Sequence, residues 1–430
     1  MKTRLIYRYM AAAFAAGAFL LGTGADASTP LAAASADGKT YDFHTYVYGP
    51  GVENLSASDP YARYQWGLKN DGEFQYVEIV NRFEDSDPRL ARHIDVANYF
   101  GFPAPVEGPD AYRQEYITAK RGIDINVLPA WNQYDADEGE KRDVIVAVID
   151  TGVDVDHPDL EGSIWVNADE IPGDGIDNDN NGYIDDVNGW NFFDDNNVLC
   201  KGSEDDHGTH AAGTIAATRG KTGIAGIADN QHVKIMPLKA LGTEYGLGEE
   251  TAVINAIRYA EANGAEICNL SFGTSTYYPE LERVMRESKM LFIVAAGNGD
   301  EEGIGLNIDV TPDYPAGYEL DNVITVANLH FDGSLAESSN FGPKNVDLAA
   351  PGIFIVSTTA DKGYGFMSGT SMAAPMVTGA AAFLYSYRTD LDLSGVKAAL
   401  IATARKLPDL EGKMVSGGML DVYAAIQYGR

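Results

Sequence analysis

The chain has 430 residues, of which 45% are hydrophobic, and its formal net charge is −32. The apolar share is ample for a folded core, and the length suits one large α/β domain with extensions, or a few small domains. The excess of acidic residues argues against nucleic acids and anionic membrane surfaces as partners.

The first 27 residues have the organisation of a secretory signal peptide. Three basic residues precede an apolar run at 10–24, and Ala25-Asp26-Ala27 follows as a cleavage sequence. The run is shorter than the roughly 20 residues that span a bilayer, which disfavours the alternative of an uncleaved anchor. We therefore expect a secreted, extracellular product without stable membrane association.

Residues 28–58 are rich in Ala, Ser, Thr and Gly and predict a linker or a short pro-segment. From about residue 124, apolar β-rich runs alternate with helical stretches, which predicts an α/β fold with a mostly parallel sheet between helices. The runs are DVIVAVID, VKIMPLKA, AEICNLSFG, LFIVAAGN and NVITVAN, and the helices are expected at 249–263, 280–289 and 373–387. Sites in such sheets form beyond the carboxyl ends of the strands.

Three short motifs place an aspartate, a histidine and a serine in this framework. Asp150 ends the run DVIVAVID, His207 lies in DDHGTHAAG, and Ser371 lies in GTSMAAP, where a helix is expected to begin. A serine hydroxyl needs a base to act as a nucleophile, and an aspartate can orient that base. Taken singly, Ser371 could be an N-cap, Asp150 a turn residue and His207 a capping residue.

The order of the three residues narrows the class. Asp before His before Ser is the subtilisin arrangement, whereas chymotrypsin-like proteases begin with His and α/β-hydrolases with Ser. The G-x-S-x-G elbow of an esterase is missing, and so is the H-E-x-x-H motif of zinc proteases. By analogy with the subtilisin arrangement, the first histidine of HGTH would be the base and His210 would have a structural role. Asn298, in AAGN, is a candidate donor to an oxyanion, or else a turn residue before glycine.

The chain resembles the subtilase family over about 122–426, where DTGVDVDHPDL, HGTHAAGTIAA, NLSFG, AAGN and GTSMAAP occur in the family's order. The resemblance implies a three-layer subtilisin-like fold and a monomeric serine endopeptidase that cleaves proteins or peptides through an acyl-enzyme. Residues 59–70 resemble the start of the mature domain, so we expect the catalytic domain at 59–430, with an unmatched insertion at about 73–121. The alternative is an inactive subtilase-fold protein that binds peptides.

The resemblance also suggests substrate subsites. An edge strand that pairs with the peptide backbone would contain Ser271, Phe272 and Gly273, and the opposite strand would contain Gly246 and Gly248. One wall of the primary specificity pocket would be Ala295, Ala296 and Gly297. Such small walls suggest room for a sizeable apolar side chain, although all of these residues could be ordinary core strands.

A loop rich in acidic residues predicts a calcium site. In GDGIDNDNNGYIDD, acidic or amide side chains alternate, a glycine supplies a turn, and the first nine positions match a calcium-binding loop, with Asn188 at the twelfth instead of Glu. The expected ligands are Asp177, Asp179, Asn181, Tyr183 through its carbonyl, and Asp185. The alternative is a solvated Asn/Asp/Gly turn. Asp159 in HPDL resembles a ligand of a second calcium site in the family.

Two cysteines allow at most one disulfide. Cys268 lies in an apolar run and Cys200 in a polar loop, and nothing in the sequence brings them together or pairs either with a histidine. We leave a bridge open and expect no catalytic cysteine.

Overall fold

The computed structural model describes residues 32–34, 40–42, 59, 61–72, 75–81, 112–221, 223–228, 230–242, 247–300 and 303–430. The expected signal peptide and Gly246 lie outside these ranges, as do most of 28–58 and much of the insertion at 73–121. Two small antiparallel pairs lie near the N-terminus: β1 (Ala32–Ala34) with β2 (Thr40–Asp42), and β3 (Gln75–Asn81) with β4 (Tyr112–Thr118).

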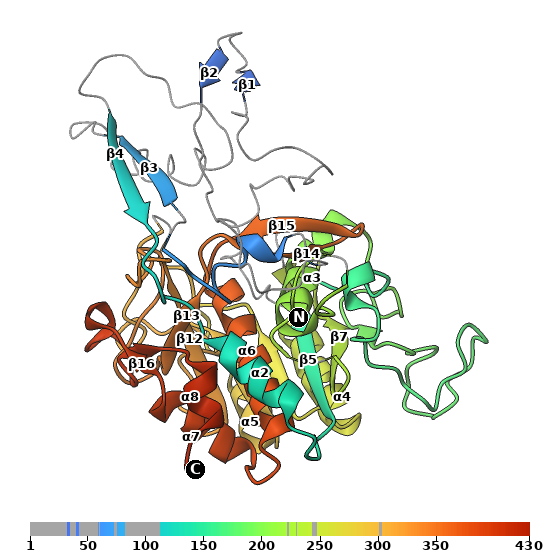
Figure 1. Ribbon diagram of the computed structural model, residues 1–430. Coiled ribbons are helices and arrows are strands. Elements are labelled where there is room, and N and C mark those ends of the chain that lie inside the picture. Colours follow the sequence, from blue (N-terminus) through green and yellow to red (C-terminus); the bar gives the residue numbers. More distant parts are fainter. Residues whose placement is uncertain are drawn as a thin grey trace.

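The core of the molecule is a nine-stranded sheet (Figure 1). All neighbouring strands are parallel except β16, which pairs antiparallel with β17 at one edge. Strands β11 and β12 are buried along their whole length, as expected for a sheet covered on both faces. The order across the sheet is β16 (Arg405–Lys406), β17 (Gly418–Met419), β13 (Leu348–Pro351), β12 (Val323–Leu329), β11 (Leu291–Ala295), β10 (Ile267–Leu270), β5 (Val144–Asp150), β7 (Val233–Lys239) and β6 (Trp190–Asn191).

Helices flank this sheet, which confirms the predicted fold class. Helices α3 and α6 pack on each other and on the central strands, whereas α4 packs on α5 and against β5 and β7. The helices are α2 (Val127–Ala136), α3 (Asp206–Ala216), α4 (Glu250–Ala262), α5 (Pro279–Glu287), α6 (Thr370–Tyr387), α7 (Leu393–Ala402) and α8 (Val422–Ile426). Among the described residues, none of the helices is long and apolar enough to span a membrane.

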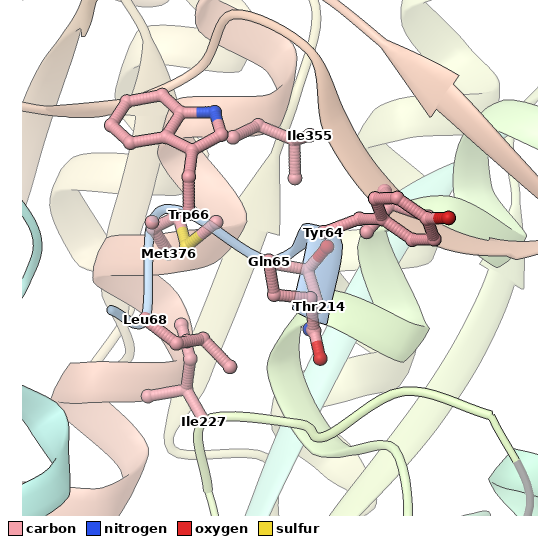
Figure 2. Close-up of a pocket in the computed structure, with 10 residues that line it drawn as sticks. Tyr64, Gln65, Trp66, Leu68, Thr214, Ile227, Ile355 and Met376 are labelled. Atoms are coloured by element: carbon pink, nitrogen blue, oxygen red, sulfur yellow. The ribbon is translucent and has the colours of Figure 1, made fainter. Parts of the chain in front are cut away.

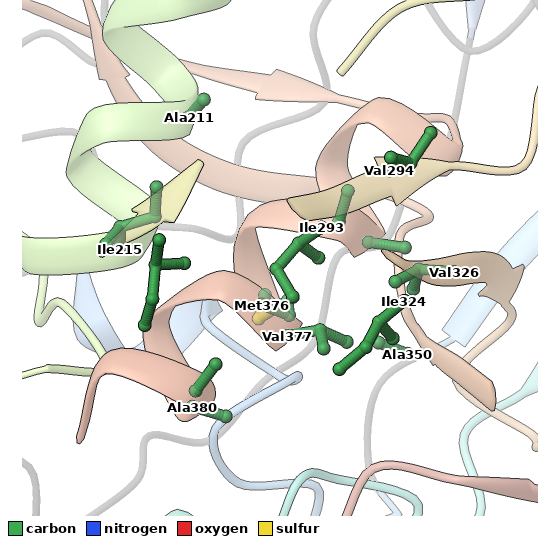
Figure 3. Close-up of a cluster of buried hydrophobic side chains, with 14 of the residues drawn as sticks. Ala211, Ile215, Ile293, Val294, Ile324, Val326, Ala350, Met376, Val377 and Ala380 are labelled. Atoms are coloured by element: carbon green, nitrogen blue, oxygen red, sulfur yellow. The ribbon is translucent and has the colours of Figure 1, made fainter. Parts of the chain in front are cut away.

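Helix α6 is buried on nearly all sides, which explains its apolar and small residues. Figure 3 shows Met376 and Val377 of α6 beside Ile293 of β11 and Ile324 of β12, with Ile215 of α3 in the same cluster. A helix held so firmly is a rigid support for the residues of its first turn. The antiparallel hairpin of β14 (Ile355–Thr359) and β15 (Gly363–Met367) packs on α3, and a shorter one joins β8 (Leu241–Gly242) to β9 (Leu247–Gly248).

Residues 61–72 pack against the catalytic core although they precede it by about 50 residues in the sequence. Trp66 and Leu68 are only 3% and 1% exposed, and Trp66 Nε1 donates a hydrogen bond to the Ile353 carbonyl at 2.8 Å. Figure 2 shows both side chains lining a small pocket together with Ile227 and Met376. This packing is consistent with a domain that begins near residue 59. The expected boundaries of the signal peptide, the pro-segment and the insertion stay predictions.

Candidate active site

Asp150 and His207 form a buried hydrogen-bonded pair. Asp150 is the last residue of β5, His207 lies in the first turn of α3, and the distance from Asp150 Oδ1 to His207 Nδ1 is 2.7 Å. Both side chains are only 1% exposed. The close approach needs glycine at 208, because a Cβ there would lie 2.2 Å from the carbonyl oxygen of Gly152. Asp150 Oδ1 also accepts the N–H of Thr151 at 2.7 Å, which fixes the carboxylate.

A second buried pair, which no sequence motif indicates, anchors the start of α3. Lys239 ends β7 in register with Asp150, and its Nζ bonds to Asp205, the residue directly before α3; both side chains are fully buried. Glu204 accepts a second bond from Lys239 at 3.2 Å. Burial raises the pKa of Asp205, and the bond to Lys239 opposes this shift. The one sign of this pair in the sequence is Lys239 itself, a charged residue at the end of an apolar run.

Ser371 lies in the first turn of α6, as predicted, and is 8% exposed. Its Oγ donates to the carbonyl of Ser271 at 2.9 Å, and Ser271 Oγ donates to the carbonyl of Ser371 at 3.0 Å. The second bond follows from the sequence of the helix: residue 375 is proline and has no N–H for the Ser371 carbonyl, so Ser271 supplies the donor instead.

The fold brings Ser371 to the same edge of the sheet as Asp150. Strands β10 and β5 are parallel neighbours with Leu270 opposite Ile149. Asp150, the last residue of β5, and Ser271, the residue after β10, therefore lie side by side at the carboxyl ends of these strands. Because Ser271 is bonded to Ser371 in both directions, the serine of α6 is held beside the carboxyl end of β5. The three residues that the sequence separates by more than 200 positions thus converge on one edge.

Asn298 follows β11 and its amide has a defined orientation. Its Oδ1 accepts the backbone N–H of Thr370 at 2.9 Å and the Thr370 hydroxyl at 3.0 Å, so its Nδ2 is the end left to donate elsewhere. A Cβ on Gly369 would lie 3.3 Å from that Nδ2, and Gly369 has φ of +147°. Nδ2 therefore lies beside the backbone that leads directly into Ser371.

His210 is fully buried behind this site and its Nε2 donates to the carbonyl of Ile355 at 2.8 Å. Burial lowers the pKa of His210 to about 3, so the ring is neutral. This packing agrees with the structural role expected for it.

The residues proposed as substrate subsites follow two adjacent strands. Ser271, Phe272 and Gly273 come directly after β10, and Ala296 and Gly297 come directly after β11, whose last residue is Ala295. Phe272, Ala295 and Ala296 are buried, whereas Gly273 and Gly297 are partly exposed. Gly248 lies in β9, paired with β8. Among the described residues of this set, Gly273 and Gly297 are thus the ones that solvent reaches in part.

Glu170, Asp177 and Asp179 form the acidic cluster of the predicted calcium loop. One carboxylate oxygen of each lies within 4.8 Å of the others, and the described residues contain no other such group of acidic, His or Cys side chains. A set of carboxylate oxygens suits a hard cation such as Ca²⁺. Glu170 was missed because it precedes the loop motif; its carboxylate accepts the N–H of Asn178 and thereby closes the loop.

The other predicted ligands lie apart from the cluster or bond within the loop. Asn181 donates its N–H to Asp177 and Asp179. Asp185 points its carboxylate at the N–H groups of residues 173–175, and Tyr183 packs its ring on Tyr259. Asp159 is fully buried in a different place, where it accepts the N–H of Ile224 at 2.8 Å.

The two cysteines are free thiols. Cys268 is buried in β10, and burial raises the pKa of Cys200 to about 11. Burial raises the pKa of Cys268 as well, which disfavours the thiolate form of both residues.

These features define an α/β protein that holds a buried Asp–His pair and a helix-borne serine at the carboxyl edge of a parallel sheet. Residues 141–418 match the sequence profile of the subtilase family, and the chain belongs to that family. It is therefore a subtilisin-like serine endopeptidase, as the sequence predicts.

Three curated relatives, all named as proteases, align with most of this chain. The major intracellular serine protease of Bacillus subtilis (strain 168) is 36% identical over 324 residues, which cover 71% of this chain and 91% of that protein. The thermophilic serine proteinase of Bacillus sp. (strain AK1) is 37% identical over 357 residues, 82% of this chain and 76% of that protein. Subtilisin-like protease 1 of Plasmodium berghei (strain Anka) is 31% identical over 336 residues, 74% of this chain and 55% of that protein.

Proposed function

We propose that Asp150, His207 and Ser371 form the catalytic triad of this protease, which cleaves proteins and peptides as a monomer. The observation that carries the proposal is the 2.7 Å bond between the buried side chains of Asp150 and His207. This pair lies at the end of strand β5, beside which Ser371 is held. The retained triad and Asn298 favour an enzyme over an inactive peptide-binding protein of the same fold.

The geometry supports a defined sequence of proton transfers. Ser371 Oγ turns from the Ser271 carbonyl toward His207, whose Nε2 takes the hydroxyl proton as Oγ attacks the peptide carbonyl. Asp150 keeps the proton of His207 on Nδ1 and stabilises the imidazolium. His207 then gives its proton to the leaving amine, and a water molecule, activated by the same His207, hydrolyses the acyl-enzyme.

The negative charge on the tetrahedral intermediate needs donors that are already in place. Asn298 Nδ2 would supply one, because its oxygen is held by Thr370, and the N–H of Ser371 in the first helical turn would supply another. Neither donor has to reorganise during the reaction, which is the advantage of a preformed oxyanion site.

We also propose that Glu170, Asp177 and Asp179 hold a structural calcium ion, with help from the loop at 177–185. The loop is attached to the domain through Asp186, which bonds to the hydroxyl of Tyr259 in α4. The ion would neutralise part of the acidic stretch between Asp150 and His207. The ion would hold parts of this loop together and would take no part in the cleavage reaction.

Secretion is the third part of the proposal and rests on residues 1–27, which have the order of a signal peptide. Two relatives are named as intracellular proteases, so location needs its own test. If the proposal is right, the mature protein recovered from the culture medium begins after Ala27. Protein that stays in the cells with Met1 intact would contradict it.

The triad is tested by Ser371→Ala. This variant should lose about 10⁶-fold in kcat on a denatured protein substrate, a magnitude taken over from the triad serine of a subtilisin. Ser394→Ala, an exposed serine at the start of α7, serves as the control and should keep full activity. Undiminished proteolysis by Ser371→Ala would contradict the assignment.

A further inference from the structure

Asp313 places a carboxylate between the two glycines that follow strands β10 and β11. A Cβ on Gly273 would lie 2.8 Å from Asp313 Oδ1, and a Cβ on Gly297 would lie 2.4 Å from Asp313 Oδ2. The carboxylate thus touches both backbones and fills the space that two side chains would otherwise occupy. Neighbouring Tyr314 exchanges backbone hydrogen bonds of 2.7 and 2.8 Å with Thr274, which fixes the approach of this segment.

The two glycines belong to the segments that hold the reacting groups. Gly273 lies two residues beyond Ser271, which is bonded to Ser371, and Gly297 directly precedes Asn298. The slot between the Gly273 and Gly297 backbones, with the Asp313 carboxylate at its base, therefore lies beside the segments that hold the proposed nucleophile and oxyanion donor. In an enzyme that cleaves an extended peptide there, the slot would receive the side chain on the amino side of the scissile bond.

The carboxylate has few partners: the backbone N–H groups of Tyr314 and Thr274 lie near it and favour its charged form, but each donates to the other residue's carbonyl. Asp313 Oδ1 is buried without a hydrogen-bond partner among the described residues, and Oδ2 has only the amide of Asn340 at 3.5 Å, longer than an ordinary hydrogen bond. Asp313 as a whole is partly exposed, although its Oδ1 is buried. A buried carboxylate with unused lone pairs is unfavourable unless a cation or donor reaches it.

We propose that Asp313 makes this enzyme prefer substrates with arginine or lysine on the amino side of the scissile bond. The inference rests on the proposed function, which makes the slot a substrate pocket. An arginine would enter between the glycines and bond to both carboxylate oxygens, and a lysine would approach as a point charge. From the sequence, the small residues of the pocket walls suggested that the pocket accepts an apolar substrate side chain. The motifs contain the two glycines but not Asp313, so they give no sign of the negative charge between them.

The test compares tetrapeptide nitroanilides that differ only in the last residue: Arg, Lys, Phe, Leu or Glu. The wild-type enzyme should cleave the Arg and Lys substrates at least tenfold better in kcat/KM than the Phe substrate. Asp313→Asn should lose about 100-fold on the Arg substrate and keep or gain activity on the Phe substrate. Benzamidine, a small amidinium inhibitor, should bind to Asp313→Asn at least tenfold more weakly.

Glu319→Gln is the matched control. It removes the same unit of charge from the exposed surface, where Glu319 pairs with Lys344, so it reports any general attraction of cationic substrates to this acidic protein. Its ratio of Arg to Phe cleavage should equal the wild-type ratio. Equal labelling of all three proteins by a fluorophosphonate verifies that the site is intact.

Two results would overturn the inference. One is a wild-type enzyme that cleaves the Phe or Leu substrate better than the Arg substrate, and the other is a ratio of Arg to Phe cleavage that Asp313→Asn leaves unchanged. If the wild-type protein cleaves none of the peptides and takes up no label, the proposed function fails, and the role of Asp313 fails with it.

Discussion

Ser371 and Asn298, the proposed nucleophile and oxyanion donor, are each oriented by a neighbouring hydroxyl-bearing residue. Ser271 holds the carbonyl and the hydroxyl of Ser371, and Thr370 uses its N–H and its hydroxyl to turn the Asn298 amide. Pro375 belongs to the same arrangement because its missing N–H frees the Ser371 carbonyl for Ser271. The orientation of Ser371 and Asn298 thus depends on hydrogen bonds to Ser271, after β10, and to Thr370, at the start of α6.

The substrate preference of the enzyme should depend on pH through Asp313. Burial raises the pKa of Asp313 to about 7, against the opposing effect of the nearby N–H groups of Tyr314 and Thr274. For an acid with a raised pKa the neutral form dominates below that value, so the cation-binding carboxylate appears only as the pH rises through about 7. The ratio of kcat/KM for the Arg substrate to that for the Phe substrate should therefore increase about 30-fold from pH 5.5 to 8.5, in proportion to the ionised fraction of Asp313.

The ratio of the two kcat/KM values cancels the pH dependence of groups that act in both reactions, such as the proposed base His207. In Asp313→Asn the same ratio should stay constant across this pH range. A flat ratio in the wild-type enzyme would contradict the proposed role of Asp313.

The sequence motifs contain the four residues proposed for the chemistry but not the residues that support them. Asp150, His207, Asn298 and Ser371 lie in short motifs whose order identifies the family. Asp313 lies between Pro312 and Tyr314 in a loop without periodicity, and only the parallel neighbours β10 and β11 bring it between two glycines. Contacts of this kind depend on register across the sheet, which no local pattern encodes.

At the level of elements, the start of α3 depends on the buried pair of Lys239 and Asp205. We expect Lys239→Met to lower the free energy of unfolding by about 3–5 kcal/mol, because it leaves Asp205 buried without its cation. Urea unfolding followed by circular dichroism measures this, in a Ser371→Ala background that prevents self-cleavage. Adding Asp205→Asn should recover much of the loss, since the unpaired charge is then gone.

The exposed pair of Lys344 and Glu319 gives the comparison for that experiment. Lys344→Met should change the free energy of unfolding by less than about 1 kcal/mol, because solvent screens an exposed ion pair. Equal losses for Lys239→Met and Lys344→Met would show that the buried pair has no special role in anchoring α3.

Long elements were predictable and short ones were not. The helices expected at 249–263, 280–289 and 373–387 correspond to α4, α5 and α6, and the five apolar runs form strands of the main sheet. Strands β6 and β17 have two residues each and no pattern to detect. The resemblance placed residues 59–70 in the domain, but no local pattern indicates which contacts bury residues 61–72, because those contacts are with residues far along the chain.

At the scale of the whole molecule, the negative charge is unevenly distributed. Residues 150–206 contain 17 Asp and Glu and one Lys, so they carry 16 of the 32 excess negative charges. Like charges at this density repel one another, and the cluster of Glu170, Asp177 and Asp179 lies in the middle of the stretch. A bound divalent cation would offset part of that repulsion where the loop folds on itself.

Removal of calcium should therefore destabilise the protein. In the Ser371→Ala background, excess EDTA should lower the midpoint of thermal unfolding by about 5 °C, as expected for an ion present at roughly 100 times its Kd. Asp177→Asn with Asp179→Asn should abolish the response to EDTA. Asp195→Asn, which removes an exposed acid of the same stretch at a positive φ that Asn also tolerates, should keep it. A melting curve that EDTA leaves unchanged would contradict the calcium site.

The most direct test of the central claim is covalent labelling by a fluorophosphonate, which reacts with a serine only when a base activates it. Mass spectrometry of the labelled protein should find a single modified residue, Ser371. The label should be absent from Ser371→Ala and at least 1,000-fold slower to form in His207→Ala, in line with the loss expected when a triad member is removed. Labelling at another residue, or at an unchanged rate in His207→Ala, would contradict a catalytic triad of Asp150, His207 and Ser371.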